Sequence, residues 1–149
     1  MPDVRELRIA VIADTHNNLS DRVIDAIRSA DEIWHLGDVT SENVIESLLA
    51  LGPRLRVVRG NCDGNADWPL EETVELNSKR FRLMHIPPKA GPADVDVVLH
   101  GHTHVPRDEK LFGIRFLNPG TAGGPSKGAP PSYAWLTIGD NLTWEVVRI

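Results

Sequence analysis

The sequence has a single cysteine, no excess of basic residues and no long apolar run. Cys62 alone cannot form an internal disulfide, so a disulfide-stabilised fold is excluded and a reducing compartment is expected. The formal net charge of -5 lacks the basic footprint of a dedicated nucleic-acid-binding protein. No apolar run approaches the roughly 20 residues of a membrane-spanning helix, and the apolar segment near the N-terminus is too short for a secretion signal. We therefore expect a soluble, cytoplasmic protein without membrane contact.

The remaining composition is that of an ordinary globular protein. The chain has 149 residues, of which 41% are hydrophobic and 25% are charged. A chain of this length buries about two-thirds of its unfolded surface in one core, and no internal repeat or linker divides it. We predict a single domain over residues 1–149.

The first half of the chain alternates strand and helix patterns. Apolar, β-branched segments predict strands at residues 7–14, 32–38 and 55–61. Helical spacing of apolar residues predicts helices within 17–31 and 40–53. The N-cap residues that we expect are Ser20 for the first helix and Thr40 or Ser41 for the second. This βαβαβ order favours a largely parallel sheet.

The second half is rich in strands and turns. Its predicted elements are a hairpin over 73–85, strands at 95–101 and 114–120, and a hairpin over 133–149 that turns at 139–141. The Gly- and Pro-rich stretch 120–132 predicts a loop longer than most connections, and such loops are either functional or mobile.

Polar side chains follow several of these strands, where the strands of a parallel sheet meet at one edge. Each alone has a structural explanation as a turn residue, a helix cap or a buried histidine. Together, carboxylates and imidazoles form a recognised donor set for transition metals, and their number suits two ions that share one carboxylate. The candidate ligands are Asp14, His16, Asp38, Asn61, His85, His102 and His104.

The order of these residues resembles the signature of the calcineurin-like metallophosphoesterases, in particular their small bacterial and archaeal phosphodiesterase branch. The matching motifs are Asp14-x-His16, Gly37-Asp38, Gly60-Asn61-Cys62-Asp63, His85, Gly101-His102-Thr103-His104 and Asn118-Pro119-Gly120-Thr121. The resemblance implies an α/β fold, a four-layer α-β-β-α sandwich of two mixed sheets, and a metal-dependent phosphoesterase, most simply a phosphodiesterase.

The resemblance also implies two metal sites. Asp14, His16, Asp38 and His104 would hold one ion, and Asp38, Asn61, His85 and His102 would hold the other. Manganese is the first expectation, with iron, zinc, nickel and cobalt as alternatives. A hydroxide bridging the two ions would attack phosphorus in line with the leaving group. The expected catalytic residues are Asp14, Asp38, Asn61, Asp63 and His102. The expected substrate is a phosphoester small molecule or a nucleotide.

Two positions depart from the wider superfamily. Cys62 stands where many members have a histidine that assists the leaving group, so that assistance is missing or comes from water. Asp63, the usual partner of that histidine, is then either catalytic or a turn residue. His85 is followed by Ile86 instead of glycine, which makes the adjoining loop stiffer and more apolar.

Several further residues have two interpretations each. His100 and His35 are expected to pack or to support the ligands rather than to bind metal. Arg59 and Lys127 are more simply surface charges than phosphate contacts. Trp68 and Trp135 are more simply core residues, although either could stack on a nucleobase.

A second function class stays open. The retromer scaffold subunit resembles the same small branch and acts through protein contacts, so a binding module without turnover is the alternative to an enzyme. The complete set of ligand residues favours the enzyme. Homo-oligomers formed through the apolar C-terminal strands are also left open.

Overall fold

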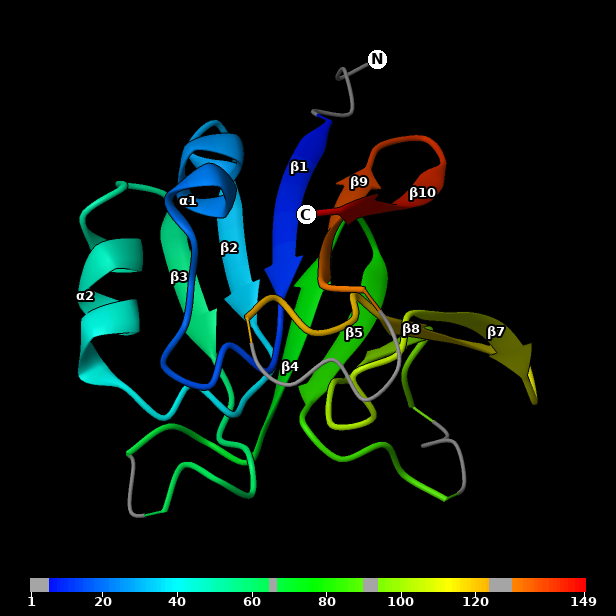
Figure 1. Ribbon diagram of the computed structural model, residues 1–149. Helices are drawn as coiled ribbons and strands as arrows, with labels where there is room; N and C mark the ends of the chain where they lie inside the picture. The colour runs from blue at the N-terminus through cyan, green and yellow to red at the C-terminus, as the bar shows by residue number, and fades with distance from the viewer. Residues whose placement is uncertain (1–5, 65–66, 90–93, 124–129) are drawn as a thin grey trace.

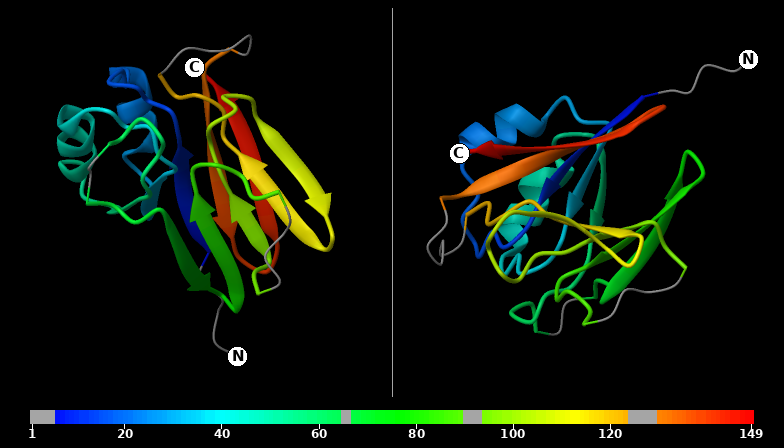
Figure 2. Two further views of the ribbon diagram at one scale, coloured as in Figure 1. Left: turned by 90° about the horizontal axis from the view of Figure 1, so that it is seen from below. Right: turned by 90° about the vertical axis from the view of Figure 1, so that its right-hand side faces the viewer.

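The computed structural model describes residues 6–64, 67–89, 94–123 and 130–149. Two five-stranded sheets face each other, and two helices lie on the outer side of the first (Figures 1 and 2). The elements are β1 (Leu7–Ile12), α1 (Asp21–Ile27), β2 (Glu32–His35), α2 (Glu42–Leu49), β3 (Arg54–Val57), β4 (Glu71–Leu76), β5 (Lys79–Met84), β6 (Val97–Leu99), β7 (Arg107–Leu111), β8 (Ile114–Asn118), β9 (Ser132–Ile138) and β10 (Leu142–Arg148).

The first sheet has the strand order β10-β9-β1-β2-β3. Strands β1, β2 and β3 are parallel, as the βαβαβ pattern predicts, whereas β9 runs antiparallel to β1. The carboxyl ends of the three parallel strands therefore lie at one edge of the sheet, the lower edge in Figure 1. The side chains that follow β1, β2 and β3 are brought together at this edge.

Both helices begin at the serines that capping chemistry favours. Ser20 Oγ accepts a hydrogen bond from Val23 N, and Ser41 Oγ accepts one from Asn43 N. The second N-cap is thus Ser41 and not Thr40. Apolar residues of both helices pack with the outer face of the first sheet into one buried cluster. This packing holds the helices against the strands that lead to the shared edge.

The second sheet has the order β4-β5-β6-β8-β7, with β5, β6 and β8 parallel. Its inner face packs on the first sheet around the contact of Trp34 with Phe81, whose ring centroids are 5.8 Å apart. The predicted α/β sandwich of two mixed sheets is confirmed. Within the described residues, both helices lie on the first sheet. The outer face of the second sheet carries an apolar cluster: Met84, Val95, Val98, Ile114 and Phe116.

Strand β7 was not predicted, because its residues Arg107 to Lys110 are all charged. It is an edge strand, and charged side chains on an edge are a common protection against pairing with another chain. Strand β6 ends at Leu99, so the predicted strand over 95–101 is too long. Within the predicted loop at 120–132, residues 124–129, Lys127 included, lie outside the described residues. Among the helices of the described residues, none has the length and apolar character to cross a bilayer.

Candidate metal centre

Seven polar side chains from five chain segments converge at the shared edge of the sheets. Asp14 and His16 follow β1, Asp38 follows β2, and Asn61 follows β3. From the second sheet, His85 follows β5, and His102 and His104 follow β6. The structure thus gathers every candidate ligand that the sequence offers into one region. The distances between their side chains show how closely they meet.

Asp14 lies at the middle of this region and is completely buried. Its Oδ1 atom is 3.3 Å from His104 Nε2, 3.7 Å from His85 Nε2 and 3.8 Å from His16 Nε2. Its Oδ2 atom accepts a hydrogen bond from the backbone N–H of His102 at 3.1 Å. Burial raises the pKa of Asp14, and the nearby imidazoles of His85 and His104 counter that rise only in part.

Asp38 is the second carboxylate of the centre. Its Oδ2 atom is 3.2 Å from His85 Nε2 and 3.5 Å from His16 Nε2, so it lies between histidines from different sheets. Its Oδ1 atom accepts a hydrogen bond from Cys62 N at 2.8 Å. Burial works against the charge of Asp38, but His85 and the Cys62 N–H outweigh it and hold the pKa well below its usual range. Asp38 is therefore ionised at neutral pH.

The four histidines form two ring pairs. His16 contacts His104 with ring centroids 5.4 Å apart, and His85 contacts His102 with centroids 5.2 Å apart. Asn61 adjoins the second pair, with its Oδ1 atom 3.1 Å from His102 Nδ1. Asp14 and Asp38 lie within reach of both pairs. The imidazoles are thus divided into two groups, and the number of ions stays a prediction.

Three buried atoms at the centre have no hydrogen-bond partner among the described residues. They are Asp14 Oδ1, His16 Nε2 and His85 Nε2. A buried polar atom without a partner costs about 1–3 kcal/mol, so three together need an explanation. Donor atoms of Asp14, His16 and His104 lie within 4.8 Å of one another, and so do those of Asp14, Asp38 and His85. The donor set fits divalent ions, which would satisfy these atoms.

His85 is held in the orientation that metal binding requires. Its Nδ1–H donates to the backbone carbonyl of Leu36 at 2.8 Å, which leaves Nε2 as the ligand atom of the neutral ring. Burial lowers the pKa of His85, but the carboxylates of Asp38 and Asp14 raise it further, so the net shift is upward. A bound cation would displace the proton that these carboxylates favour.

The backbone at the centre adopts an uncommon conformation. Asp14, His16, Asp38, His102 and His104 all have positive φ, between 46° and 75°. Non-glycine residues rarely occupy this left-handed region, and when they cluster there, the strain often serves a site. This conformation also sets the directions of the His102 and His104 rings. The segment with His102 and His104 is not extended, so these rings contact different partners instead of sharing one side of a strand.

Glycines at the strand ends leave room for the ligand side chains. A Cβ atom on Gly37 would lie 2.8 Å from His85 Nδ1, and one on Gly101 would lie 2.9 Å from Asp14 Oδ2. A Cβ on Gly60 would collide with Asp38 Oδ1. The structure shows that the ligand side chains themselves occupy the space.

Asp63 supports the centre from one side. Its carboxylate accepts backbone hydrogen bonds from Asp38 at 2.9 Å, Thr40 at 2.9 Å and Gly60 at 2.7 Å. It joins the turn after β2 to the turn after β3, which is the turn role considered for it. A catalytic role for Asp63 stays a prediction. The sequence signal for this anchor was its place in the Gly60-Asn61-Cys62-Asp63 motif.

His35 and His100 are buried outside the centre, as expected. Gly37 N donates to His35 Nδ1, and Thr15 Oγ1 lies 3.0 Å from His35 Nε2. His100 Nδ1 is 3.0 Å from Gly101 O, and Arg107 Nη1 is 3.1 Å from His100 Nε2. Burial lowers the pKa of His35 to about 3 and that of His100 to about 4. Both rings are therefore neutral.

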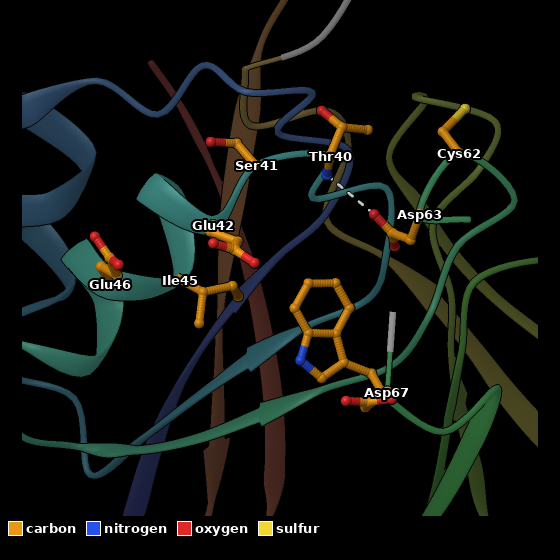
Figure 3. Close-up of a pocket in the computed structure, with 9 residues that line it drawn as sticks. Thr40, Ser41, Glu42, Ile45, Glu46, Cys62, Asp63 and Asp67 are labelled. Carbon is orange, nitrogen blue, oxygen red and sulfur yellow. Dashed lines mark hydrogen bonds between the residues drawn. The ribbon is translucent and has the colours of Figure 1, made fainter. Parts of the chain in front are cut away.

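The other candidate residues that the structure describes are Trp135, Arg59 and Trp68. Trp135 is half-buried and packs against the cluster under the helices, with the Arg8 guanidinium 4.1 Å from its ring centroid. The backbone N–H of Arg59 donates to Pro69 O. Trp68 lines a pocket beside the centre, together with Glu42, Glu46 and Asp67 (Figure 3). These acidic residues were not predicted as site residues, because nothing in their local pattern separates them from exposed surface charges.

Comparison with known proteins assigns the family. The sequence profile of the calcineurin-like phosphoesterase superfamily domain matches residues 7–141. The chain belongs to this superfamily. It is 30% identical to a probable metallophosphoesterase of Methanothermobacter thermautotrophicus, over 94% of this chain and 91% of the relative. It is 29% identical to the phosphodiesterase YfcE of Escherichia coli, over 96% and 92%.

A solved structure shares the fold. Wild-type Vps29 of Entamoeba histolytica complexed with Zn²⁺ superposes with a TM-score of 0.75 at 22% identity, over 95% of this chain and 99% of that one. At this identity the likeness shows the fold alone. The predicted family is thus confirmed by the profile and by the relatives in sequence. This chain shares the phosphoesterase superfamily with these relatives, and its own donor set is suited to metal.

Proposed function

We propose that this protein is a dinuclear-metal-dependent phosphodiesterase whose ions lie at the centre described above. The observation that carries the proposal is the buried set of Asp14 Oδ1, His16 Nε2 and His85 Nε2, which have no hydrogen-bond partner among the described residues and face one another across two sheets. Such an arrangement is costly without cations and favourable with them. The family and the name of the YfcE relative support the reaction class.

The ligand assignment follows the two ring pairs. Asp14, His16 and His104 would hold one ion and His85, His102 and Asn61 the other, with Asp38 between them. When bound, two divalent ions lower the pKa of a water molecule and neutralise charge that develops on the phosphoryl oxygens. Manganese is our first candidate; the carboxylate and amide oxygens suit it, whereas the imidazoles also suit iron, zinc and nickel. Iron, zinc, nickel and cobalt are the alternatives.

The protein's own contribution is to fix these donors before substrate arrives. The Leu36 carbonyl sets the tautomer of His85, and Asp63 holds the backbone of Asp38. Asn61 is exposed and His102 is half-buried, whereas His85 and His104 are buried. The open side of the centre is thus the side of Asn61 and His102. We propose that the phosphoryl group approaches from there and that Asp14 orients the attacking water.

The reaction forms a P–O bond to the water oxygen and breaks the P–O bond to the leaving oxygen, which takes up a proton. Cys62 is the side chain in place of the usual histidine. Partial loss of hydration and the Asp38 carboxylate raise the pKa of its thiol, so it is a weak acid at neutral pH. Without a strong proton donor there, we expect a preference for diesters and for good leaving groups.

The test is hydrolysis of bis(p-nitrophenyl) phosphate by protein that is stripped with chelator and reloaded with Mn²⁺, Zn²⁺, Co²⁺, Ni²⁺ or Fe²⁺. We expect activity only with metal, two equivalents bound per chain, and a loss of about 100-fold or more for Asp38→Asn or His104→Ala. Asp140→Asn, in an exposed turn, is the matched control. A protein that binds no ion at this centre, or that is equally active with and without metal, would refute the proposal.

The same assay addresses the alternative of a scaffold without turnover. A protein that binds two ions but hydrolyses neither monoesters nor diesters would favour a binding module of this fold. The single-domain organisation over 1–149, the cytoplasmic location and association into homo-oligomers stay predictions. Sedimentation of the purified protein tests the last of these.

A further inference from the structure

An open cavity of about 650 Å³ lies beside the metal centre, between the start of α2 and the turn after β3. Its volume is within the range of small-molecule sites. Figure 3 shows Glu42 and Ile45 of α2 on one side and Cys62 and Asp63 on the other. Trp68, which is half-buried, completes the apolar part of the wall with Ile45.

The cavity and the metal centre share a boundary. Cys62 lines the cavity, and its Sγ atom lies within 4.8 Å of ligand atoms of His16 and Asp38. Its backbone N–H donates to Asp38 Oδ1. Asp63, the other shared residue, uses both carboxylate oxygens to hold backbone N–H groups of the centre. A phosphodiester bound at the centre would therefore place one of its two ester substituents in the cavity.

The charge of the cavity has one sign. Besides Asp63, it is lined by the exposed carboxylates of Glu42, Glu46 and Asp67, and none of these three forms an ion pair with another described residue. No lysine, arginine or histidine is among the lining residues, all of which are described. A substituent that carries a second phosphate would be repelled here. A purely apolar substituent would contact Trp68 and Ile45 but would offer no positive charge to the carboxylates of the cavity.

We infer that the cavity receives a positively charged alkylammonium group attached to one ester arm of the phosphodiester substrate. Carboxylates attract such a cation, and an indole face binds quaternary ammonium groups through cation–π contact. The carboxylates of the cavity would then bind the cation, and the adjoining metal centre would bind the negatively charged phosphate. This inference names the substrate class of the proposed function and rests on it.

The first experiment measures binding of tetramethylammonium to the metal-free full chain by calorimetry and by tryptophan fluorescence. We expect saturable binding that weakens about fivefold or more in Glu42→Gln and in Trp68→Leu. Glu145→Gln, an exposed glutamate on β10, is the matched control and should bind like the wild type. Circular dichroism verifies that each variant is folded. Absence of saturable binding, or equal binding by all variants, would overturn the inference.

The second experiment compares two substrates of the metal-loaded protein that share the p-nitrophenol leaving group. One carries choline on the other ester arm, and its counterpart carries an ethyl group. We expect kcat/KM to be about tenfold higher for the choline ester, mainly through KM, and Glu42→Gln to reduce this ratio toward one.

The outcomes separate this inference from the proposed function. Hydrolysis of both esters at equal kcat/KM leaves the phosphodiesterase proposal intact and overturns the assignment of the cavity. A preference for an anionic substituent would overturn it as well. Tetramethylammonium binding without hydrolysis of either ester would instead refute the proposed function and, with it, the claim that the cavity serves a substrate.

Discussion

Asp63 Oδ2 accepts a hydrogen bond from the backbone N–H of Asp38 at 2.9 Å and another from Gly60 N at 2.7 Å. One carboxylate oxygen thus ties together two turns that come from neighbouring strands. Asp38 in turn faces His85 of the second sheet at 3.2 Å. The contact chain from Asp63 through Asp38 to His85 connects a surface turn to the interior of the centre.

This relationship predicts that Asp63→Asn weakens metal binding, because an amide has one acceptor oxygen for three N–H donors. We expect metal affinity to fall about 10- to 100-fold and the free energy of unfolding to fall by about 1–3 kcal/mol. Metal titration by calorimetry and urea denaturation measure the two effects. If Asp63 only positions Asp38, saturating metal restores kcat. If kcat stays low at saturating metal and the pH–rate profile changes, Asp63 acts in catalysis.

Gly60→Ala is predicted to disrupt the centre because the new Cβ would overlap Asp38 Oδ1 and the Asp38 backbone nitrogen. Overpacking of this kind costs about 1–3 kcal/mol, and here the atoms that must move include a metal ligand. Gly139→Ala is the matched control, since the nearest atom to its Cβ would be 3.7 Å away. Equal metal affinity of the two variants, measured by titration, would contradict this account of Gly60.

Cys62→His is predicted to extend activity toward substrates with poor leaving groups, because an imidazolium can supply the proton that a weakly acidic thiol does not. The measurement is kcat/KM across aryl phosphodiesters of graded leaving-group pKa. We expect a shallower slope for Cys62→His than for the wild type, with Cys62→Ser as the control. An unchanged slope would remove the hypothesis that Cys62 limits the range of substrates.

His100→Gln is predicted to change the pH dependence of stability in metal-free protein. Burial, with the nearby Arg107 guanidinium, lowers the pKa of His100 to about 4 in the folded state, whereas the unfolded value is about 6.5. Between these values only the unfolded chain binds the proton, so this contribution is complete above about pH 6.5 and is lost as the pH falls toward 4. The loss is about 3 kcal/mol.

Guanidinium denaturation of the wild type and His100→Gln at several pH values tests this expectation. At pH 7 the variant should be less stable, because it loses the hydrogen bonds of the ring. The advantage of the wild type in free energy of unfolding should shrink and then reverse as the pH falls toward 4. A stability difference that does not vary with pH would contradict the assigned role of His100.

The sequence predicted the part of the fold that depends on repeating patterns. The βαβαβ half, the capping serines and the hairpin turn at 139–141 all follow from apolar periodicity and turn chemistry. Strand β7 could not be found this way, because an edge strand of charged residues has no buried face to show in its sequence. Its pairing with β8 is decided by tertiary structure alone.

In the candidate site, too, the contacts that depend on tertiary structure could not be predicted from the sequence. The positions of its polar residues after strands predicted which side chains would meet, but not how. His100, His102 and His104 alternate in sequence, yet His100 contacts Arg107 of the edge strand β7. His102 and His104 diverge toward His85 and His16, because both have positive φ. Neither the Leu36 carbonyl nor the acidic cavity has a local sequence signal, since each depends on segments that are distant along the chain.

The left-handed backbone at five of the ligand residues has a practical consequence for experiments. Asp63 and the close approaches at Gly37, Gly60 and Gly101 already brace this main chain in the apoprotein. We therefore expect one metal to be exchanged for another by dialysis, without a refolding step. Amide resonances of the surrounding loops should shift only slightly when a diamagnetic ion is added. Different ions could then be compared in one preorganised site with the same backbone.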